Sequence, residues 1–196
     1  MISLDHAEWW LMLVVFVAGA GGAMAFEVVR VTRGRAGLIS ILAAGAIGLF
    51  LAHGPILRSL DSSIDWILVA ILVTYATDTA AYIVGSNVGS RKFAPRISPN
   101  KTWEGTLGGI IAGIGTAFAL AEILDLPVTM ASVGLIGIAA STAAVIGDLA
   151  ESGLKRIAGV KDSGGIIPGH GGILDRIDSL APNLAVVYWM AEWLTV

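Results

Sequence analysis

Residues 147–178 read GDLAESGLKRIAGVKDSGGIIPGHGGILDRID and hold nine charged side chains. The whole chain of 196 residues has only 12 Lys and Arg and 15 Asp and Glu, so about a third of the charge lies in this stretch. Four polar residues follow one another at helical spacing near its start: Asp148, Glu151, Ser152 and Lys155. This spacing places two carboxylates, a hydroxyl and an ammonium on one face of a helix end.

A glycine-rich segment follows this helix end. Five glycines surround Pro168 and His170: Gly164, Gly165, Gly169, Gly171 and Gly172. Such a backbone can approach a ligand closely and present its N–H groups. Asp175 and Asp178 come next and would share a face if a helix resumes there. A charged helix end, a pliable loop and a second acidic pair are together suited to a metal-bound polyphosphate.

The stretch resembles the signature of the phosphatidate cytidylyltransferases, also called CDP-diacylglycerol synthases. The matching positions keep the family's spacing and are Ser152, Lys155, Arg156, Lys161, Asp162, 168–172, Asp175, Arg176 and Asp178. Residues 98–105, SPNKTWEG, resemble a shorter upstream motif of the same family, and residues 78–82, DTAAY, are also similar. The resemblance covers about residues 65–196, and the chain is shorter than typical bacterial members.

The chain as a whole is strongly apolar. Hydrophobic residues make up 56% and charged residues 14%, whereas ordinary soluble domains carry about 25% charged residues. The mean hydropathy is +0.81. Cysteine is absent, which excludes disulfides and Cys-ligated metals. This composition predicts an integral membrane protein.

Six apolar stretches approach the length of about 20 residues that crosses a membrane. They are residues 8–29, 37–57, 65–88, 105–124, 128–150 and 180–195. We therefore expect an all-α, polytopic protein with short loops and a single membrane domain. Residues 1–60 would supply two spans without motifs, and residues 61–196 the catalytic part, with motif loops at 89–105 and 147–178.

The basic residues predict the orientation. The loops after the first, third and fifth stretches contain all Lys and Arg residues except Arg58. Because short cytoplasmic loops are enriched in Lys and Arg, these loops should face the cytoplasm and both termini should be extracytoplasmic. The expected location is the cell (inner) membrane, with a multi-pass chain whose site faces the cytoplasm.

A ridge of small residues predicts one helix contact. Gly105, Gly109 and Gly113 recur at intervals of four residues, which is typical of close helix packing in membranes. The contact can form within one chain or between two copies, so a homodimer is one assembly that the sequence allows.

Carboxylates inside or near the membrane are the strongest candidates for a site. Asp78 lies within an apolar stretch, where a carboxylate costs about 2.5 to 3.5 kcal/mol on insertion scales. It either pairs with neighbours for packing or belongs to a polar cavity, with Tyr82 one turn on. Mg²⁺ takes oxygen ligands, usually one or two carboxylates plus substrate phosphates. Asp148 and Asp175, on either side of the glycine segment, can supply two, and the resemblance implies the same pair; a second cation is left open.

The resemblance implies roles for further residues. The catalytic group would be Lys155, Arg156, Lys161, His170, Arg176 and Asp178. The substrate-binding group would be Asp78, Tyr82, Ser98, Asn100, Lys101, Thr102, Glu104, Ser152, Gly171 and Gly172. An ion pair between Glu151 and Lys155, a basic loop touching lipid headgroups, and a structural role for His170 are the simpler alternatives.

The upstream motif begins a predicted span. Asn100 and Thr102 are good N-cap residues, and a lysine beside a helix N-terminus is suited to an anion. We therefore expect Lys101 to contact a phosphate, and Lys92 to be an ordinary loop lysine.

The reaction that the resemblance implies is CTP plus phosphatidate giving CDP-diacylglycerol plus pyrophosphate. The expected partners are CTP and phosphatidate within the bilayer, with Mg²⁺ and without nucleic acid. One alternative is a related lipid cytidylyltransferase or a polyprenol-type lipid kinase. An alternative of another class is an ion- or proton-coupled transporter using Asp78 and Asp148. Crowding of the polar residues on one side of the membrane, and no detected inverted repeat, favour the enzyme.

Overall fold

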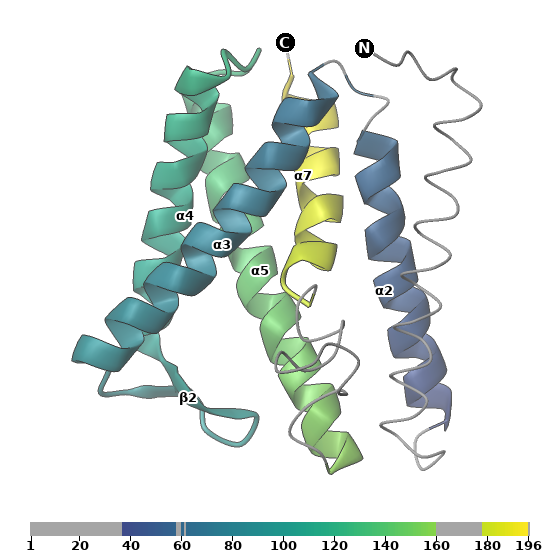
Figure 1. Cartoon of the computed structure of the whole chain (residues 1–196), viewed down its shortest axis with the longest axis vertical. Coiled ribbons are helices and arrows are strands. Elements are labelled where there is room, and N and C mark those ends of the chain that lie inside the picture. The colour runs from purple at the N-terminus through teal and green to yellow at the C-terminus, as the bar shows by residue number, and fades with distance from the viewer. Residues whose placement is uncertain (1–36, 58–59, 61, 160–177, 196) are drawn as a thin grey trace, which may run out of the picture.

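The computed structural model describes residues 37–57, 60, 62–159 and 178–195 (Figure 1). In this part the chain is mostly helical. Its helices are α2 (Gly37–Leu57), α3 (Ser63–Val88), α4 (Trp103–Ile123), α5 (Met130–Ala158) and α7 (Leu180–Leu194). The expected span 8–29 lies outside the described residues, whereas each of the other five predicted stretches is a helix with similar bounds.

Three of these helices are long and apolar enough to cross a membrane: Ile64–Val88, Trp103–Ile123 and Met130–Ile157. Within α2 the apolar segment Gly45–Gly54 is shorter, and α7 has 15 residues. The chain is therefore that of a membrane protein with three candidate spans among its described residues.

Helix α5 continues beyond the predicted stretch 128–150. It runs to Ala158 and ends at Gly159, whose φ of 72° is the left-handed conformation that favours glycine. Glu151, Lys155 and Arg156 consequently remain helical. Half of the most apolar part of α5 is buried, against 28% for α3 and for α4. Asp148 and Glu151 thus lie on the most enclosed of the three candidate spans.

A β-hairpin stands between α3 and α4, where the sequence predicted only a loop. Its strands β1 (Lys92–Ala94) and β2 (Ser98–Thr102) are antiparallel, with Lys92 opposite Thr102. Figure 1 shows the hairpin at the end of the bundle where α3 ends and α4 begins. Strands of three and five residues containing Pro99 have too little alternation to stand out in a sequence. The all-α expectation is corrected here by one small hairpin.

The predicted glycine ridge is a helix contact within the chain. A Cβ atom on Gly105 would lie 2.9 Å from the Cα of Gly85 on α3, and one on Gly109 would lie 2.6 Å from the Thr77 carbonyl oxygen. Real Cβ atoms essentially never approach so closely. Glycine at these positions is therefore what allows α3 and α4 to touch through their backbones.

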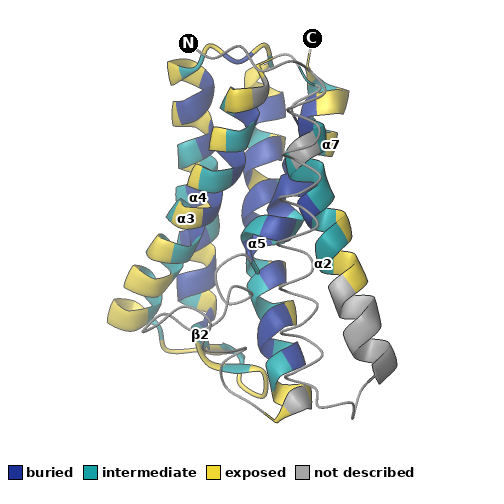
Figure 2. Ribbon diagram, turned by 45° about the vertical axis from the view of Figure 1, so that its right-hand side comes forward, coloured by how far each residue is buried: buried dark blue, intermediate teal, exposed yellow. Residues whose placement is uncertain are grey.

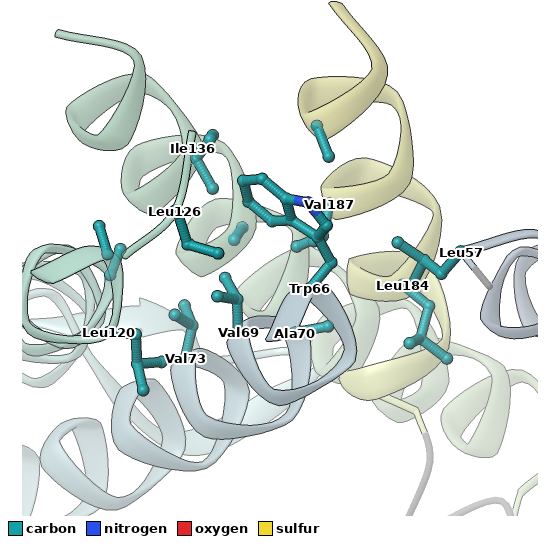
Figure 3. Packing of buried hydrophobic residues seen from close by; sticks show 14 of the residues in the cluster. Leu57, Trp66, Val69, Ala70, Val73, Leu120, Leu126, Ile136, Leu184 and Val187 are labelled. Atoms are coloured by element: carbon teal, nitrogen blue, oxygen red, sulfur yellow. The ribbon is translucent and has the colours of Figure 1, made fainter. Parts of the chain in front are cut away.

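The apolar core lies at the end of the bundle away from the hairpin. Figure 3 shows Trp66 of α3 among side chains of α5 and α7, including Ile136 and Val187. Figure 2 shows exposed residues on the hairpin and the adjoining end of α3, and others at the opposite end of the bundle.

A buried amide fixes the start of α7 against α3. The fully buried Asn183 donates from Nδ2 to the Ala70 carbonyl oxygen at 2.9 Å and to the Thr74 hydroxyl at 2.7 Å. Helix α7 begins part-way along the bundle (Figure 1), and Asp178 and Ser179, which precede it, line a cavity together with Asp78 of α3.

Candidate active site

A cavity of about 760 Å³ lies next to the hairpin. The second half of α3, the end of β2, the first turn of α4, the second half of α5 and residues 178–179 all contribute to it. Its described charged residues are Asp78, Lys92, Lys101, Asp148, Glu151, Lys155 and Asp178. Cavities of about 300 to 1,000 Å³ are typical of small-molecule sites, but the charge here favours an ionic ligand.

Lys101 reaches the cavity because the hairpin leads directly into α4. Thr102 is the predicted N-cap, and its hydroxyl accepts a hydrogen bond from the Gly105 N–H at 3.1 Å. The Thr106 hydroxyl donates to the Thr102 carbonyl oxygen at 2.9 Å. Lys101 precedes this rigid cap, and its Nζ lies 2.5 Å from Asp148 Oδ2. The two sequence motifs therefore meet in one ion pair.

Helix α5 arranges a second set of charges on the same wall. The Ser152 hydroxyl donates to Asp148 Oδ1 at 3.4 Å, one helical turn away. Lys155 Nζ lies 2.6 Å from Glu151 Oε2, so the predicted ion pair between these residues is confirmed. Glu151 is buried, and its charge is balanced by an ammonium that also lines the cavity.

Asp178 brings a further carboxylate from the start of α7. Its Oδ1 accepts a hydrogen bond from the Ser179 N–H at 2.7 Å. Burial, followed by the negative charge of Asp148, raises the pKa of Asp178 to about 7. Carboxylates thus repel one another across this cavity, which is the electrostatic condition that a bound cation relieves.

The donor set fits a hard cation only in part. Asp78, Asp148 and Asp178 offer carboxylate oxygens, the ligand type that Mg²⁺ prefers. In the described ranges, no three His, Asp or Glu side chains converge closely enough to hold an ion by themselves. An ion here would therefore need additional oxygens, from a bound phosphate or from residues outside these ranges such as Asp175.

The model of the cytidylyltransferase family matches residues 2–194, nearly the whole chain. The chain belongs to the cytidylyltransferase family. Among its relatives, the phosphatidate cytidylyltransferase of Bacillus subtilis (strain 168) is 43% identical over 150 residues, which are 76% of this chain and 56% of the relative.

Two further relatives carry the same name. The phosphatidate cytidylyltransferase of Staphylococcus epidermidis (strain ATCC 12228) is 48% identical over 119 residues, covering 61% of this chain and 46% of the relative. That of Pseudomonas aeruginosa (strain PAO1) is 34% identical over 189 residues, covering 94% of this chain and 68% of the relative. The chain thus spans about half to two thirds of the length of these curated relatives.

The structure brings together eight of the predicted site residues around the cavity: Asp78, Tyr82, Asn100, Lys101, Thr102, Asp148, Lys155 and Asp178. Ser152 lies behind Asp148 and contacts it. Six predicted site residues lie outside the described residues: Lys161, His170, Gly171, Gly172, Asp175 and Arg176. Ser98, Glu104 and Arg156 are described but do not line this cavity.

Glu104 and Arg156 hold the hairpin in place. The Glu104 carboxylate accepts hydrogen bonds from the Ser90 hydroxyl at 2.9 Å and from the backbone N–H groups of Ser90 and Arg91. Arg156 Nε donates to the Ile97 carbonyl oxygen at 3.1 Å. The first contact ties the base of the hairpin to α4, and the second ties its turn to α5. Both side chains thus act on the wall that carries Lys101.

Lys92 and Ser179 are among the groups of the cavity that the sequence analysis did not assign to the site. Lys92, expected to be an ordinary loop lysine, lines the cavity because its strand pairs with β2 opposite Thr102. Ser179 lines it because α7 begins there. The pattern of apolar and basic residues gives no signal that Lys92 belongs to the cavity. Ser179 could have been predicted to belong to it, because it directly follows Asp178.

Proposed function

We propose that this family member is a phosphatidate cytidylyltransferase, which transfers CMP from CTP to phosphatidate and forms CDP-diacylglycerol and pyrophosphate. The observation that carries the proposal is the ion pair between Lys101 and Asp148, which joins the two family motifs inside one cavity at the polar end of membrane helices. The names of the relatives support the choice of substrates.

The chemistry requires two polyanions to be held in line. A phosphate oxygen of phosphatidate forms a bond to the α-phosphorus of CTP, while the bond from that phosphorus to the bridging oxygen of the β-phosphate breaks and pyrophosphate leaves. Positioning and charge neutralisation supply most of the catalysis in such transfers. Lys101 and Lys155 would neutralise phosphate oxygens, with Lys161 and Arg176 as further proposed cations outside the described residues.

Asp148 and Asp175 are the residues that we propose to hold Mg²⁺, and Asp78 and Asp178 line the same cavity as Asp148. When bound, the ion supplies charge neutralisation of the phosphates and of the leaving pyrophosphate. Two observations support this role: Asp148 of α5 lines the cavity, and the Ser152 hydroxyl donates to its Oδ1. Ligands from one or two carboxylates plus phosphate oxygens agree with the incomplete donor set of the described residues.

The lipid substrate would enter between the helices. Tyr82 of α3 lines the cavity, yet 76% of its surface is exposed. Because α3 is a candidate membrane span, we propose that the cavity opens toward lipid beside Tyr82. Phosphatidate can then present its phosphate without its chains leaving the membrane, while CTP enters from the hairpin end.

We further propose six spans with both termini outside and the hairpin on the cytoplasmic side, with residues 61–196 as the catalytic part. The end of α3, the hairpin and the start of α4 share one end of the bundle, as this topology requires (Figure 1). Because the chain has no cysteine, a single cysteine can report its side. In intact cells, Gly165→Cys should react with an impermeant thiol reagent only after the membrane is opened, and Asp125→Cys without opening. Reversed labelling would contradict the topology.

The test of the activity uses two labels. Purified protein in detergent is incubated with phosphatidate, Mg²⁺ and CTP labelled at either the α- or the γ-phosphorus. Label from the α-position alone in the lipid fraction supports the proposal. Label from the γ-position in lipid would indicate a lipid kinase, and no labelled lipid would contradict any transfer to phosphatidate. Asp148→Asn serves as the inactive control.

A further inference from the structure

Lys92 occupies a part of the cavity wall that neither motif contains. It begins β1, lines the cavity and stands opposite Thr102, the residue that caps α4. Directly opposed residues of an antiparallel pair have their Cβ atoms about 4.5 to 5.5 Å apart. The side chain of Lys92 therefore starts next to the N-terminus of α4, where partial positive charge is concentrated.

The three lysines that line the cavity differ in whether they form an ion pair. Lys101 is paired with Asp148 at 2.5 Å, and Lys155 is paired with Glu151 at 2.6 Å. In the part of the chain that the structure describes, Lys92 makes no ion pair with a carboxylate. Its positive charge is consequently available to an incoming anion without first breaking an existing pair.

The surroundings of Lys92 also limit the kind of ligand. The hairpin is fixed to α4 through Glu104 and to α5 through Arg156, so the stem of Lys92 is attached to a wall held at both ends. The hydroxyl of Thr102, which would otherwise accompany it, is already used in capping α4. A lysine ammonium is a compact point charge, and beside a helix N-terminus it suits a phosphate oxygen.

We propose that Lys92 is a phosphate-binding residue of the active site, contacting a phosphate group opposite the wall formed by Asp148 and Lys155. The assignment rests on the proposed function. The shared ligand chemistry is a phosphate monoester or anhydride oxygen, and its source is either the headgroup of phosphatidate or the polyphosphate of CTP. Lys92 adds a cation to the two motif lysines and so extends the positive part of the site onto β1.

The test measures binding and turnover separately in three variants. Lys92→Gln removes the charge, and Lys92→Arg retains it. Arg96→Gln removes a charge from the same hairpin at a position that does not line the cavity. Binding of CTP with Mg²⁺ and binding of a short-chain phosphatidate are each measured by calorimetry in detergent, and KM and kcat are determined for both substrates.

Lys92→Gln should weaken the binding of one substrate and raise its KM by about 5- to 30-fold. This fold-change lies between the loss expected for an exposed ion pair and the loss expected for a charge-assisted hydrogen bond. Its kcat should change little, because uniform binding is lost. Lys92→Arg should restore most of the affinity, and Arg96→Gln should stay within about twofold of wild type. The substrate whose affinity falls identifies the source of the phosphate.

The two proposals fail in different ways. If wild type forms labelled lipid but Lys92→Gln binds both substrates as Arg96→Gln does, the assignment of Lys92 is overturned and the activity stands. A fall in kcat with unchanged affinities would overturn it too. If affinity depends on Lys92 but no cytidylyl transfer occurs, the phosphate-binding role stands and the proposed function fails.

Discussion

The backbone contact between α3 and α4 predicts that a single methyl group at Gly109 destabilises the protein. A Cβ atom there would lie 2.6 Å from the Thr77 carbonyl oxygen and 2.9 Å from the Ala81 Cβ, whereas ordinary contact begins at 3.4 Å. The helices would have to separate by several tenths of an ångström to accept it. Overpacking of this kind costs about 1 to 3 kcal/mol.

Gly115, on the same helix, is the matched control. Among the described residues, no atom lies within 4 Å of an added Cβ, and Gly115 is exposed. Gly115→Ala therefore adds the same methyl group without a clash, and alanine is favoured over glycine inside a helix by up to about 1 kcal/mol. Only Gly109→Ala should lower stability, which separates the packing effect from the change of residue type.

The assay is thermal unfolding in detergent, followed by tryptophan fluorescence. A change of 1 kcal/mol shifts Tm by about 2 to 4 °C in a chain of this length, so Gly109→Ala should lower Tm by about 2 to 12 °C. Gly115→Ala should leave Tm unchanged or slightly raised. Equal Tm values for the two variants would refute the inferred backbone contact and with it the position of α4 against α3.

Three further predictions concern the site. Asp148→Asn and Asp175→Asn should each abolish CDP-diacylglycerol formation while leaving detergent-solubilised folding nearly intact, and normal turnover at saturating Mg²⁺ would exclude that residue as a ligand. Lys101→Ala should lower kcat/KM about 10- to 100-fold through a lost charge-assisted contact, whereas Arg96→Ala should matter little; equal effects would reduce the upstream motif to a helix start. Asn183→Leu should cost about 0.6 to 1.7 kcal/mol of stability, measured as a lower Tm, and an unchanged Tm would contradict its anchoring role.

The helices were predictable because each is a long apolar stretch with few charges. Composition alone sets their approximate bounds, and α2 matches its predicted range 37–57 at both ends. The spacing of Asp148, Glu151 and Lys155 predicted that the helix continues past residue 150, whereas its end at Ala158 was not predicted. Charged residues such as Lys155 continue a helix well once it leaves the apolar layer.

The site was predictable as a set of residue types but not as a geometry. The spacing of Asp148 and Ser152 gives their common helix face, because that relation is local. The pairing of Lys101 with Asp148 is not local, and it depends on how a hairpin of two short strands returns the chain toward α5. The same hairpin explains why Lys92, which is exposed as expected, also lines the cavity, and why Glu104 contacts Ser90.

The ion pair between Lys101 and Asp148 couples the effects of substitutions at the two residues. Under the proposed function each has a second partner, a phosphate for the lysine and Mg²⁺ for the aspartate. Until these arrive, the two side chains neutralise each other in a partly enclosed site, where an unpaired charge is costly. With a Mg²⁺-nucleotide bound, Lys101 would contact a phosphate and Asp148 would contact Mg²⁺. These two contacts would offset the loss of the ion pair between the side chains. Removing Asp148 therefore deletes a metal ligand and also leaves Lys101 without its resident partner, and the losses from the two single variants should not add.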